Sequence, residues 1–190
     1  MNALELLKNR VSIPKLRAPA PDQKLMDECY QVAMRAPDHG RLKPWRFIQI
    51  TDEGLDRLGQ LYLDAENFDS VKNQGEEVSE VRRQKLISMP QRAPMIVVVV
   101  GRVEAHPKVP REEQLIAAGC AAYGLSVSLF AQGFGCMWRT GALAYHPVVR
   151  TGLELDENEE IVGYLYIGTA DCTPKTPKPQ QIEDFLTKWE

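Results

Sequence analysis

The six consecutive apolar residues from Met95 to Val100 constrain the fold of this chain more than any other segment. They read Met-Ile-Val-Val-Val-Val, without a polar interruption. An unbroken β-branched run of this kind is typical of a strand that is buried on both faces. Such a strand needs a layer of side chains on each side of its sheet. The segment therefore predicts a sheet that is covered by helices.

The stretch from Gln114 to Trp138 contains no charged residue and is the second strong constraint. About 20 apolar residues can cross a bilayer, so a membrane span is one interpretation. However, serines, glutamines and glycines interrupt the stretch, and it lacks an aromatic belt and a bias of flanking basic residues. A helix that is apolar all round is more often buried in protein. We therefore expect residues 112–132 to form a buried helix.

The rest of the chain interleaves helical and extended patterns. Strands are predicted at residues 45–51 and 161–169, and a short extended segment at 136–140. Residues 67–75 are polar and are expected to form a mobile loop, which is a candidate lid. Helices are predicted at residues 3–8, 22–34, 55–66, 76–87, 148–153 and 182–189. Because these elements do not follow strict βαβ units, the fold class is α+β or a mixed α/β layer.

Composition limits the functional classes that are open to the chain. Its 190 residues suit one domain, and no linker divides them. Lys and Arg number 23 against 26 Asp and Glu, which gives a net charge of −3. Strong non-specific binding to nucleic acid needs a basic surplus. We therefore expect no nucleic-acid partner.

The cysteines and the N-terminus indicate the compartment. Cys29, Cys120, Cys136 and Cys172 are widely spaced and form no C-x-x-C pair, which favours reduced cysteines over a zinc site or a redox dithiol. The three histidines are scattered and give no metal-ligand spacing. The first ten residues mix charges with leucines and do not resemble a signal peptide. We expect a cytoplasmic protein without a metal or a membrane segment.

Arg10 and Ser12 are candidates for binding an anion. A guanidinium offers a planar fork of donors and a hydroxyl offers one more, which together suit a phosphate group. The alternative is structural: a C-terminal arginine that balances the dipole of a short helix, followed by a turn serine. His39 in the turn after residue 34 is likewise either a cofactor contact or an exposed turn residue.

Trp138, Arg139 and Thr140 combine a ring, a guanidinium and a hydroxyl directly after Gly133 and Gly135. A dinucleotide-binding glycine motif must follow a strand and open a helix, whereas these glycines follow a helix. The alternative is a strand with one buried Trp and one exposed Arg. Taken together, the arginines could hold an anion and the glycines and Trp138 could bound a flat ring. This joint pattern favours a bound heterocycle that carries phosphate.

Four blocks of the sequence, in order, resemble the nitroreductase family of flavoproteins, and within it the short YdjA-type NAD(P)H nitroreductases. The resemblance covers nearly the whole chain. The blocks are residues 3–12 (ALELLKNRVS), residues 34–47 with the pieces MRAPDH and KPWRF, residues 131–142 with the pieces AQGFG and WRTGA, and residues 161–169 (IVGYLYIGT).

The resemblance implies a central mixed sheet covered by helices, in an intertwined homodimer that binds FMN at its interface. It assigns FMN contacts to eight residues: Arg10, Val11, Ser12, Arg35, His39, Trp138, Arg139 and Thr140. It assigns nicotinamide-cofactor binding to a further stretch: Ala131, Gln132, Gly133, Phe134, Gly135 and Cys136. The helix from residue 112 would form the core of the dimer.

The implied activity is transfer of a hydride from NADH or NADPH to FMN, followed by reduction of a nitro compound, quinone or similar small acceptor in a ping-pong reaction. The flavin carries the chemistry, so no catalytic side chain is assigned. Arg35, His39 and Arg41 are candidates for stabilising the reduced flavin. The alternatives are a flavin enzyme of the same fold with a specific metabolite, a non-catalytic FMN-binding homodimer, and an interaction protein without cofactor.

The sequence also departs from the family pattern around the cofactor phosphate. Val11 stands where most members have a second arginine, and Pro14 replaces a basic residue, leaving Lys15 as its neighbour. The basic C-terminal segment of the larger members is missing. Fewer cations then remain for the phosphate, and Arg139 is the candidate.

Overall fold

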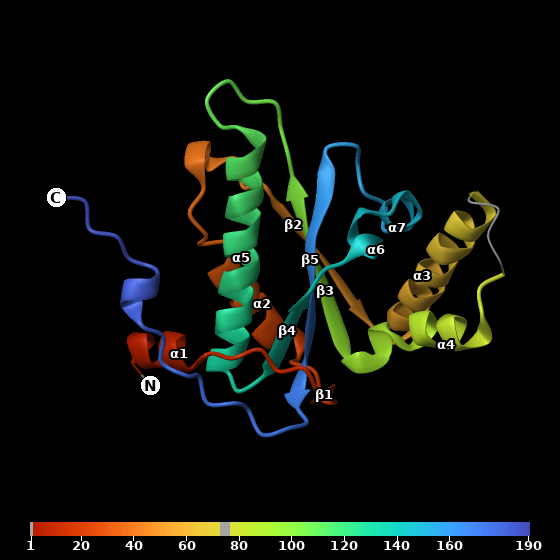
Figure 1. Ribbon diagram of the computed structural model, residues 1–190, viewed down its shortest axis with the longest axis horizontal. Helices are drawn as coiled ribbons and strands as arrows, with labels where there is room; N and C mark the ends of the chain where they lie inside the picture. The colour runs from red at the N-terminus through yellow and green to blue at the C-terminus, as the bar shows by residue number, and fades with distance from the viewer. Residues whose placement is uncertain (1, 73–76) are drawn as a thin grey trace.

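The predicted strand at Met95 forms the centre of the sheet in the computed structural model, which describes residues 2–72 and 77–190 (Figure 1). Strand β3 (Met95–Arg102) lies between β2 (Trp45–Thr51) and β5 (Glu159–Ala170). The far edge of β5 pairs with β4 (Gly135–Arg139) and then with β1 (Leu16–Arg17). The side chains of residues 96–100 have no exposed surface, so burial on both faces is confirmed.

The pairing of these strands is antiparallel throughout the described residues. The expected mixed sheet is therefore corrected in this detail, although the α+β class and the helical covering are confirmed. The physical reason is the place of β5. It inserts between β3 and β4, which run in the same direction, so those two strands never become neighbours.

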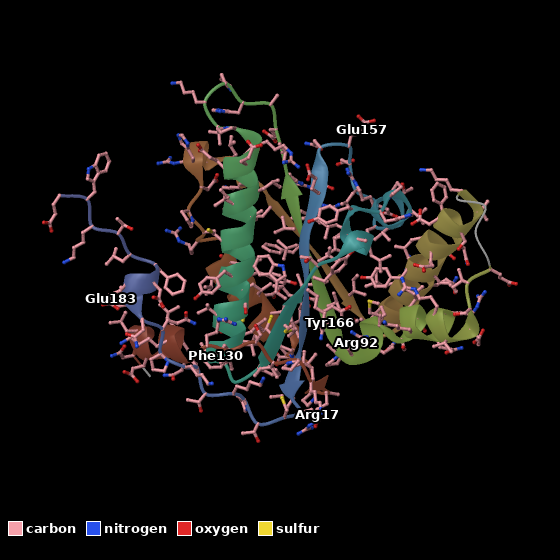
Figure 2. The ribbon with its side chains drawn as sticks, viewed as in Figure 1. Arg17, Arg92, Phe130, Glu157, Tyr166 and Glu183 are labelled. Carbon is pink, nitrogen blue, oxygen red and sulfur yellow. The ribbon has the colours of Figure 1, made fainter. Side chains whose placement is uncertain are left out.

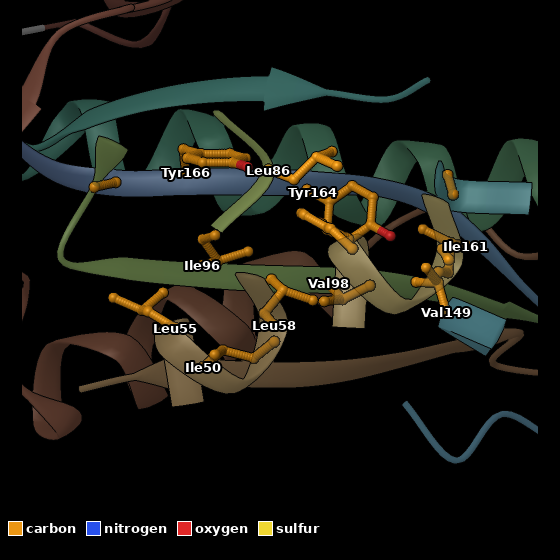
Figure 3. Packing of buried hydrophobic residues seen from close by; sticks show 14 of the residues in the cluster. Ile50, Leu55, Leu58, Leu86, Ile96, Val98, Val149, Ile161, Tyr164 and Tyr166 are labelled. Atoms are coloured by element: carbon orange, nitrogen blue, oxygen red, sulfur yellow. The ribbon is translucent and has the colours of Figure 1, made fainter. Parts of the chain in front are cut away.

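Helices cover the two faces of the sheet as separate layers (Figure 1). On one face, α2 (Gln23–Ala33) and α5 (Arg111–Ala131) pack on the odd-numbered side chains of β3, Val97 and Val99. On the other, α3 (Glu53–Lys72), α4 (Glu80–Ser88) and α7 (Pro147–Gly152) pack on Ile96, Val98 and Val100 (Figure 3). The alternation of side chains along a strand separates these two clusters.

Helix α5 matches the predicted buried helix and lies against the sheet. Its sheet-facing side consists of small and branched side chains that are fully or almost fully buried: Ala117, Ala118, Ala121, Ala122, Leu125 and Leu129. By length and composition, α5 is the one helix among residues 2–72 and 77–190 that could cross a membrane. Its outer side carries the exposed residues Ile116 and Tyr123.

Three predicted boundaries are corrected. Helix α3 continues to Lys72 instead of ending at residue 66, because Phe68 packs edge-on against His146 at 5.8 Å and Asp69 lies 3.2 Å from the same ring. Residues 67–72 of the predicted loop are therefore helical, and the rest of that loop lies outside the described residues. Helix α4 begins at Glu80, where the Ser79 hydroxyl caps it, and residue 76 of the predicted helix is also outside them.

The third correction concerns the C-terminus. In place of a helix over 182–189 there is a single 3-10 turn at Ile182–Asp184, and the segment runs away from the sheet (Figure 1). The apolar side chains that would form its buried face are exposed, and Trp189 is completely so. A short helix needs tertiary packing to be stable, and this one has no surface of its own chain to pack on.

The remaining elements are short. Helix α1 (Ala3–Asn9) is capped by the Asn2 side chain, and α6 (Ala142–Tyr145) follows β4. Single 3-10 turns lie at His39–Arg41 and at Pro90–Arg92. The predicted helices near the N-terminus and at 148–153 and the predicted strands are confirmed within one or two residues.

Candidate functional site

The segment after α1 is attached to β4. The backbone N–H of Ile13 donates to the carbonyl of Cys136 at 3.0 Å, and the Lys15 carbonyl accepts from Asp171 N–H at 2.9 Å. Gly135 permits this approach, because a Cβ there would lie 3.1 Å from Ile13 Cβ and 2.5 Å from Leu16 Cδ2. Ser12 is thereby placed between β4 and the chain that leaves β5.

A cavity of about 310 Å³ opens beside Ser12, and we call it the lysine cavity. Lys15 and Lys175 line it, together with the hydroxyl residues Ser12 and Thr173 and the side chain of Met137. No carboxylate lines it, and neither lysine forms an ion pair within the described part of the chain. Two ammonium groups and two hydroxyls are a suitable donor set for a phosphate.

A second cavity of about 370 Å³ shares Met137 with the first, and we call it the tyrosine cavity. Four of its eleven lining residues are aromatic, and its polar groups come from arginine, tyrosine and threonine. The residues that line it are Tyr62, Met89, Arg92, Met137, Trp138, Arg139, Thr140, Leu143, Ala144, Tyr164 and Tyr166.

Two buried polar atoms at the tyrosine cavity have no partner in the described chain: Arg139 Nε and Tyr164 Oη. The guanidinium of Arg139 lies over the Tyr166 ring, 5.3 Å from its centroid. Buried polar groups are nearly always hydrogen-bonded in proteins, so orphaned donors beside a cavity indicate a ligand that would satisfy them. Flat aromatic walls further suit a planar heterocycle.

The electrostatics of the tyrosine cavity are positive. Burial raises the pKa of Tyr164 well above its usual value. Burial also raises the pKa of Tyr166, and the charges of Arg139 and Arg92 only partly offset this effect. Both hydroxyls therefore stay neutral at physiological pH. Because no carboxylate lines the cavity, the two guanidinium groups leave it with an uncompensated positive charge.

The structure places Arg10 outside both cavities. Its guanidinium lies 5.9 Å from the ring centroid of Tyr123 on α5. Burial raises the pKa of the nearby Cys136 thiol to about 11, and a hydrogen bond with Ser126 and the charge of Arg10 only partly offset this effect. Val11 is half-buried beside it. The predicted triplet is therefore divided, with Ser12 in the lysine cavity and Arg10 on the outer surface of α5.

The exposures of Trp138 and Arg139 are the opposite of the structural alternative, which was a strand with a buried Trp and an exposed Arg. Trp138 is 36% exposed, whereas Arg139 is half-buried with its Nε fully enclosed. The indole lies on Gly163, where a Cβ would come within 2.0 Å of Trp138 Nε1. Trp138 therefore faces the α5 side of β4, and Arg139 faces the tyrosine cavity on the other side.

Arg35 and His39 do not meet the other predicted residues within one chain. The ring of His39 contacts Glu113 in the first turn of α5, with Nδ1 2.9 Å from Oε2. Tyr123, which Arg10 contacts, is ten residues further along the helix, or about 15 Å at 1.5 Å per residue. Arg35 is exposed just after α2, and Arg41 belongs to the same turn as His39.

The stretch predicted to bind nicotinamide is the turn between α5 and β4. Ala131, Gln132 and Gly133 are exposed, and Gly133 has a φ of +83° that favours glycine. Phe134 is half-buried, and Gly135 and Cys136 are buried beneath the N-terminal segment. Only the first half of the stretch is therefore accessible from outside the chain.

Several residues of the two cavities were not expected from the sequence. Arg92, Lys175 and Tyr62 lie outside the four blocks that resemble the family, and Tyr164 and Tyr166 lie in the last block without having been assigned a role. One signal was available for Tyr164 and Tyr166, which are two residues apart in a strand and thus share a face. No sequence signal pointed to Arg92 or Lys175, because they come to the site from two separate loops.

The chain matches the model of the nitroreductase family over residues 7–169. It therefore belongs to the nitroreductase family and is an oxidoreductase of that class. An Escherichia coli (strain K12) protein named "Putative NAD(P)H nitroreductase YdjA" is 40% identical over 179 residues, which cover 93% of this chain and 92% of that protein. A Haemophilus influenzae protein named "Putative NAD(P)H nitroreductase" is 37% identical over 98% of this chain and 99% of its own length.

Solved structures show the same fold. A nitroreductase-like family protein from Bacillus cereus superposes with a TM-score of 0.84 at 23% identity, over 100% of this chain and 97% of the other. A protein titled FMN and NADPH-dependent nitroreductase NfnB, from sphigopyxis sp. strain HMH, gives 0.75 at 18% identity over 100% and 99%. At these identities the likeness concerns the fold, and it confirms the expected nitroreductase-like architecture.

Proposed function

We propose that residues 1–190 form a single FMN-binding domain that acts as an NAD(P)H-dependent oxidoreductase on small acceptors such as nitro compounds or quinones. The observation that carries the proposal is the pair of cavities that share Met137 as a lining residue, one lined by lysines and hydroxyls and the other by tyrosines and arginines. The names of the relatives, NAD(P)H nitroreductases, support the choice of nucleotide.

The residues that line the two cavities would hold FMN in one orientation. The lysine cavity would hold the phosphate, with Ser12, Lys15 and Lys175 as donors. The tyrosine cavity would hold the ring, where the unpartnered Arg139 Nε and Tyr164 Oη would find acceptors. In this arrangement Arg139 would contact the flavin ring rather than the phosphate that the sequence predicted, because its guanidinium lies over Tyr166. Lys175 would supply positive charge to the phosphate in place of the missing basic C-terminal segment.

A second copy of the chain would complete the site, as an intertwined homodimer. Ile116 and Tyr123 are 66% and 46% exposed on the outer side of α5, and they separate Arg10 and Trp138 from Arg35 and His39. A copy packed on this surface could bring its Arg35 and His39 toward the Arg10 and Trp138 of the first. Neighbouring exposed apolar side chains extend the surface: Leu4, Leu7, Val32 and Met34. Large exposed apolar areas mark such interfaces.

The C-terminal segment supports the intertwined form of the dimer. It leaves β5, runs along the base of the fold and ends beyond α1 (Figure 1). Its apolar residues are exposed in a single chain: Ile182, Phe185, Leu186 and Trp189. A segment of this kind is buried most readily on a partner copy.

The chemistry that FMN supplies when it is bound is a two-electron relay: it takes a hydride from NADH or NADPH, and the acceptor then receives the two electrons with protons from the cofactor and from water. The chain's own residues bind and orient. Thr140 and Arg139 would fix the ring, whereas the Trp138 indole lies on the α5 side of β4, where a partner copy would pack. The exposed turn Ala131–Gly133 remains the candidate contact for the nucleotide, and bound water would supply protons to the acceptor.

We also propose that the protein is cytoplasmic. The four cysteines, Cys29, Cys120, Cys136 and Cys172, are free in the structure. Free cysteines suit the reducing cytoplasm.

An absorption spectrum of the purified protein tests the proposed function. We expect flavin bands in the visible range, or their appearance after FMN is added and the excess removed, and bleaching by NADH or NADPH without oxygen. Bleaching by one nucleotide identifies the donor. Bands that persist with both nucleotides would indicate a flavin-binding protein without this activity. A protein that stays colourless after FMN addition would contradict the proposal.

A further inference from the structure

Arg92 and Arg139 are two arginines without a counter-charge in the described chain, although both line the same cavity. Some arginines elsewhere in the chain do have a carboxylate partner. Arg46 and Arg102 share the buried carboxylate of Glu159, and Arg82 makes two hydrogen bonds to Glu66. Unpaired positive charges that converge on a half-enclosed site are a signature of anion binding.

The two arginines and Tyr166 line the same cavity from different elements. Arg139 reaches it from β4, where Met137 is the direct cross-strand partner of Tyr166 and Arg139 that of Tyr164. Arg92 lines the same cavity from the turn before β3, and its charge lowers the pKa of the Tyr166 hydroxyl. Figure 2 shows Arg92 and Tyr166 beside each other at this end of the sheet.

The turn that carries Arg92 is fixed on both sides. Pro90 and Ala93 are buried, and Gln91 Nε2 donates to Asp56 Oδ1 on α3 at 2.7 Å. Met89 N–H donates to the Leu86 carbonyl at the end of α4. Arg92 is therefore presented to the cavity by a braced backbone, although its own side chain is exposed. A preorganised charge stabilises a developing charge without reorganisation.

We infer that Arg92, together with Arg139, stabilises the negative charge that the flavin ring gains on reduction, so that Arg92 raises the reduction potential of the bound cofactor. This inference rests on the proposed function. Uptake of two electrons and one proton leaves the ring with one negative charge. A cation at the cavity favours that form over the neutral oxidised ring. Arg35, His39 and Arg41 lie outside the tyrosine cavity of their own chain, so they would act on the flavin only from a partner copy.

The test compares Arg92→Gln and Arg92→Lys with the matched control Arg57→Gln. Arg57 lies on α3 at a different cavity, next to β2. Three quantities are measured on each loaded protein: the Kd of oxidised FMN, the midpoint potential, and the Kd of sulfite. Sulfite adds through its sulfur lone pair to the flavin N5 and moves an electron pair onto the pyrimidine edge. The adduct therefore reports the same negative charge without any reductant.

For R92Q we expect sulfite binding to weaken about tenfold and the midpoint potential to fall by about 30 mV, which is the equivalent of tenfold for a two-electron couple. The Kd of oxidised FMN should change less than about threefold, because the oxidised ring is neutral. R92K should keep most of the wild-type values, since the charge remains. R57Q should match the wild type.

Unchanged sulfite binding and potential in FMN-loaded R92Q would overturn the inference and leave the proposed function intact. An equal shift in R57Q, or in R92K, would also overturn it, because the effect would then not depend on charge at this position. If the wild-type protein takes up no FMN, the proposed function itself fails and the inference falls with it. The Kd for oxidised FMN separates these cases.

Discussion

Met137 on β4 stands directly across from Tyr166 on β5, and its side chain lines both the lysine cavity and the tyrosine cavity. The residue thereby lies beside both a site suited to phosphate and a site suited to a flat ring. Alternation along β4 places Met137 and Arg139 on this face and Trp138 on the face of α5. The proposed orientation of FMN follows from the pairing register of β4 with β5.

The lysine cavity should determine the affinity for the cofactor phosphate. We expect the double variant K15M/K175M to weaken FMN binding by roughly tenfold to a hundredfold, because each charge-assisted contact contributes about 1.5–3 kcal/mol before screening by solvent. Riboflavin lacks the phosphate, so its Kd should stay the same. Both are measured by flavin fluorescence quenching. Lys188→Met, in the exposed C-terminal segment, is the control. An equal loss of riboflavin affinity would place the phosphate elsewhere.

The outer surface of α5 should hold two copies together. Ile116→Asp places a charge in the middle of this exposed apolar surface. We expect the wild type to elute as a dimer in size-exclusion chromatography with light scattering, and I116D as a monomer with weakened FMN binding. Val81→Asp is the matched control, because Val81 is also exposed and apolar but lies on α4. A wild-type monomer that binds FMN fully would contradict the dimer.

Glu159 should contribute to stability in a pH-dependent way. Its carboxylate is 1% exposed, and it accepts hydrogen bonds from Arg46 at 2.6 and 2.9 Å and from Arg102 at 2.8 Å. We expect Glu159→Gln to lower the free energy of unfolding by roughly 2–3 kcal/mol at pH 7. This is less than for a fully buried pair, because both arginines reach solvent. Urea denaturation checks the value, and the exposed Glu157→Gln should be neutral.

The sign of the pH effect follows from the pKa of Glu159. Burial alone would raise this pKa, but the hydrogen bonds from Arg46 and Arg102 outweigh it and hold the pKa below its usual value. A depressed folded-state pKa gives stability that is present above the unfolded pKa of about 4.3 and is lost as the pH falls through the folded value. The difference between wild type and E159Q should therefore shrink on acidification below about pH 4. A difference that stays constant would assign the effect to packing.

Gly163 should be required for the position of Trp138. Its substitution by alanine would bring a Cβ within 2.0 Å of Trp138 Nε1, so the indole must move. We expect G163A to cost roughly 1–3 kcal/mol of unfolding free energy, as overpacking does. Trp138→Phe removes the clashing atom. The double variant should therefore recover part of the loss, which a double-mutant cycle measures as a coupling energy. If the two substitutions have additive effects, the contact between residue 163 and the Trp138 indole does not cause the loss of stability.

Local pattern was sufficient for the elements that depend on nearest neighbours. The β-branched run at Met95, the long apolar helix α5 and the extended segment before Thr140 were predicted with small errors at their ends. The terminal helix at Ile182 was wrong because its apolar spacing has no surface of its own chain to cover. The loop predicted at 67–75 was wrong over residues 67–72, because Phe68 and Asp69 contact His146, which is far along the sequence.

The sequence by itself determined which segments are strands or buried helices, and it presented Ser12, Trp138, Arg139 and Thr140 as candidate cofactor contacts. Only the tertiary structure decided which of them share a cavity, and that Arg92 and Lys175 join them. The reason is that periodicity reports the environment of a residue along one element. A binding site also depends on strand register and on loops from both ends of the chain, and these are fixed only when the sheet assembles.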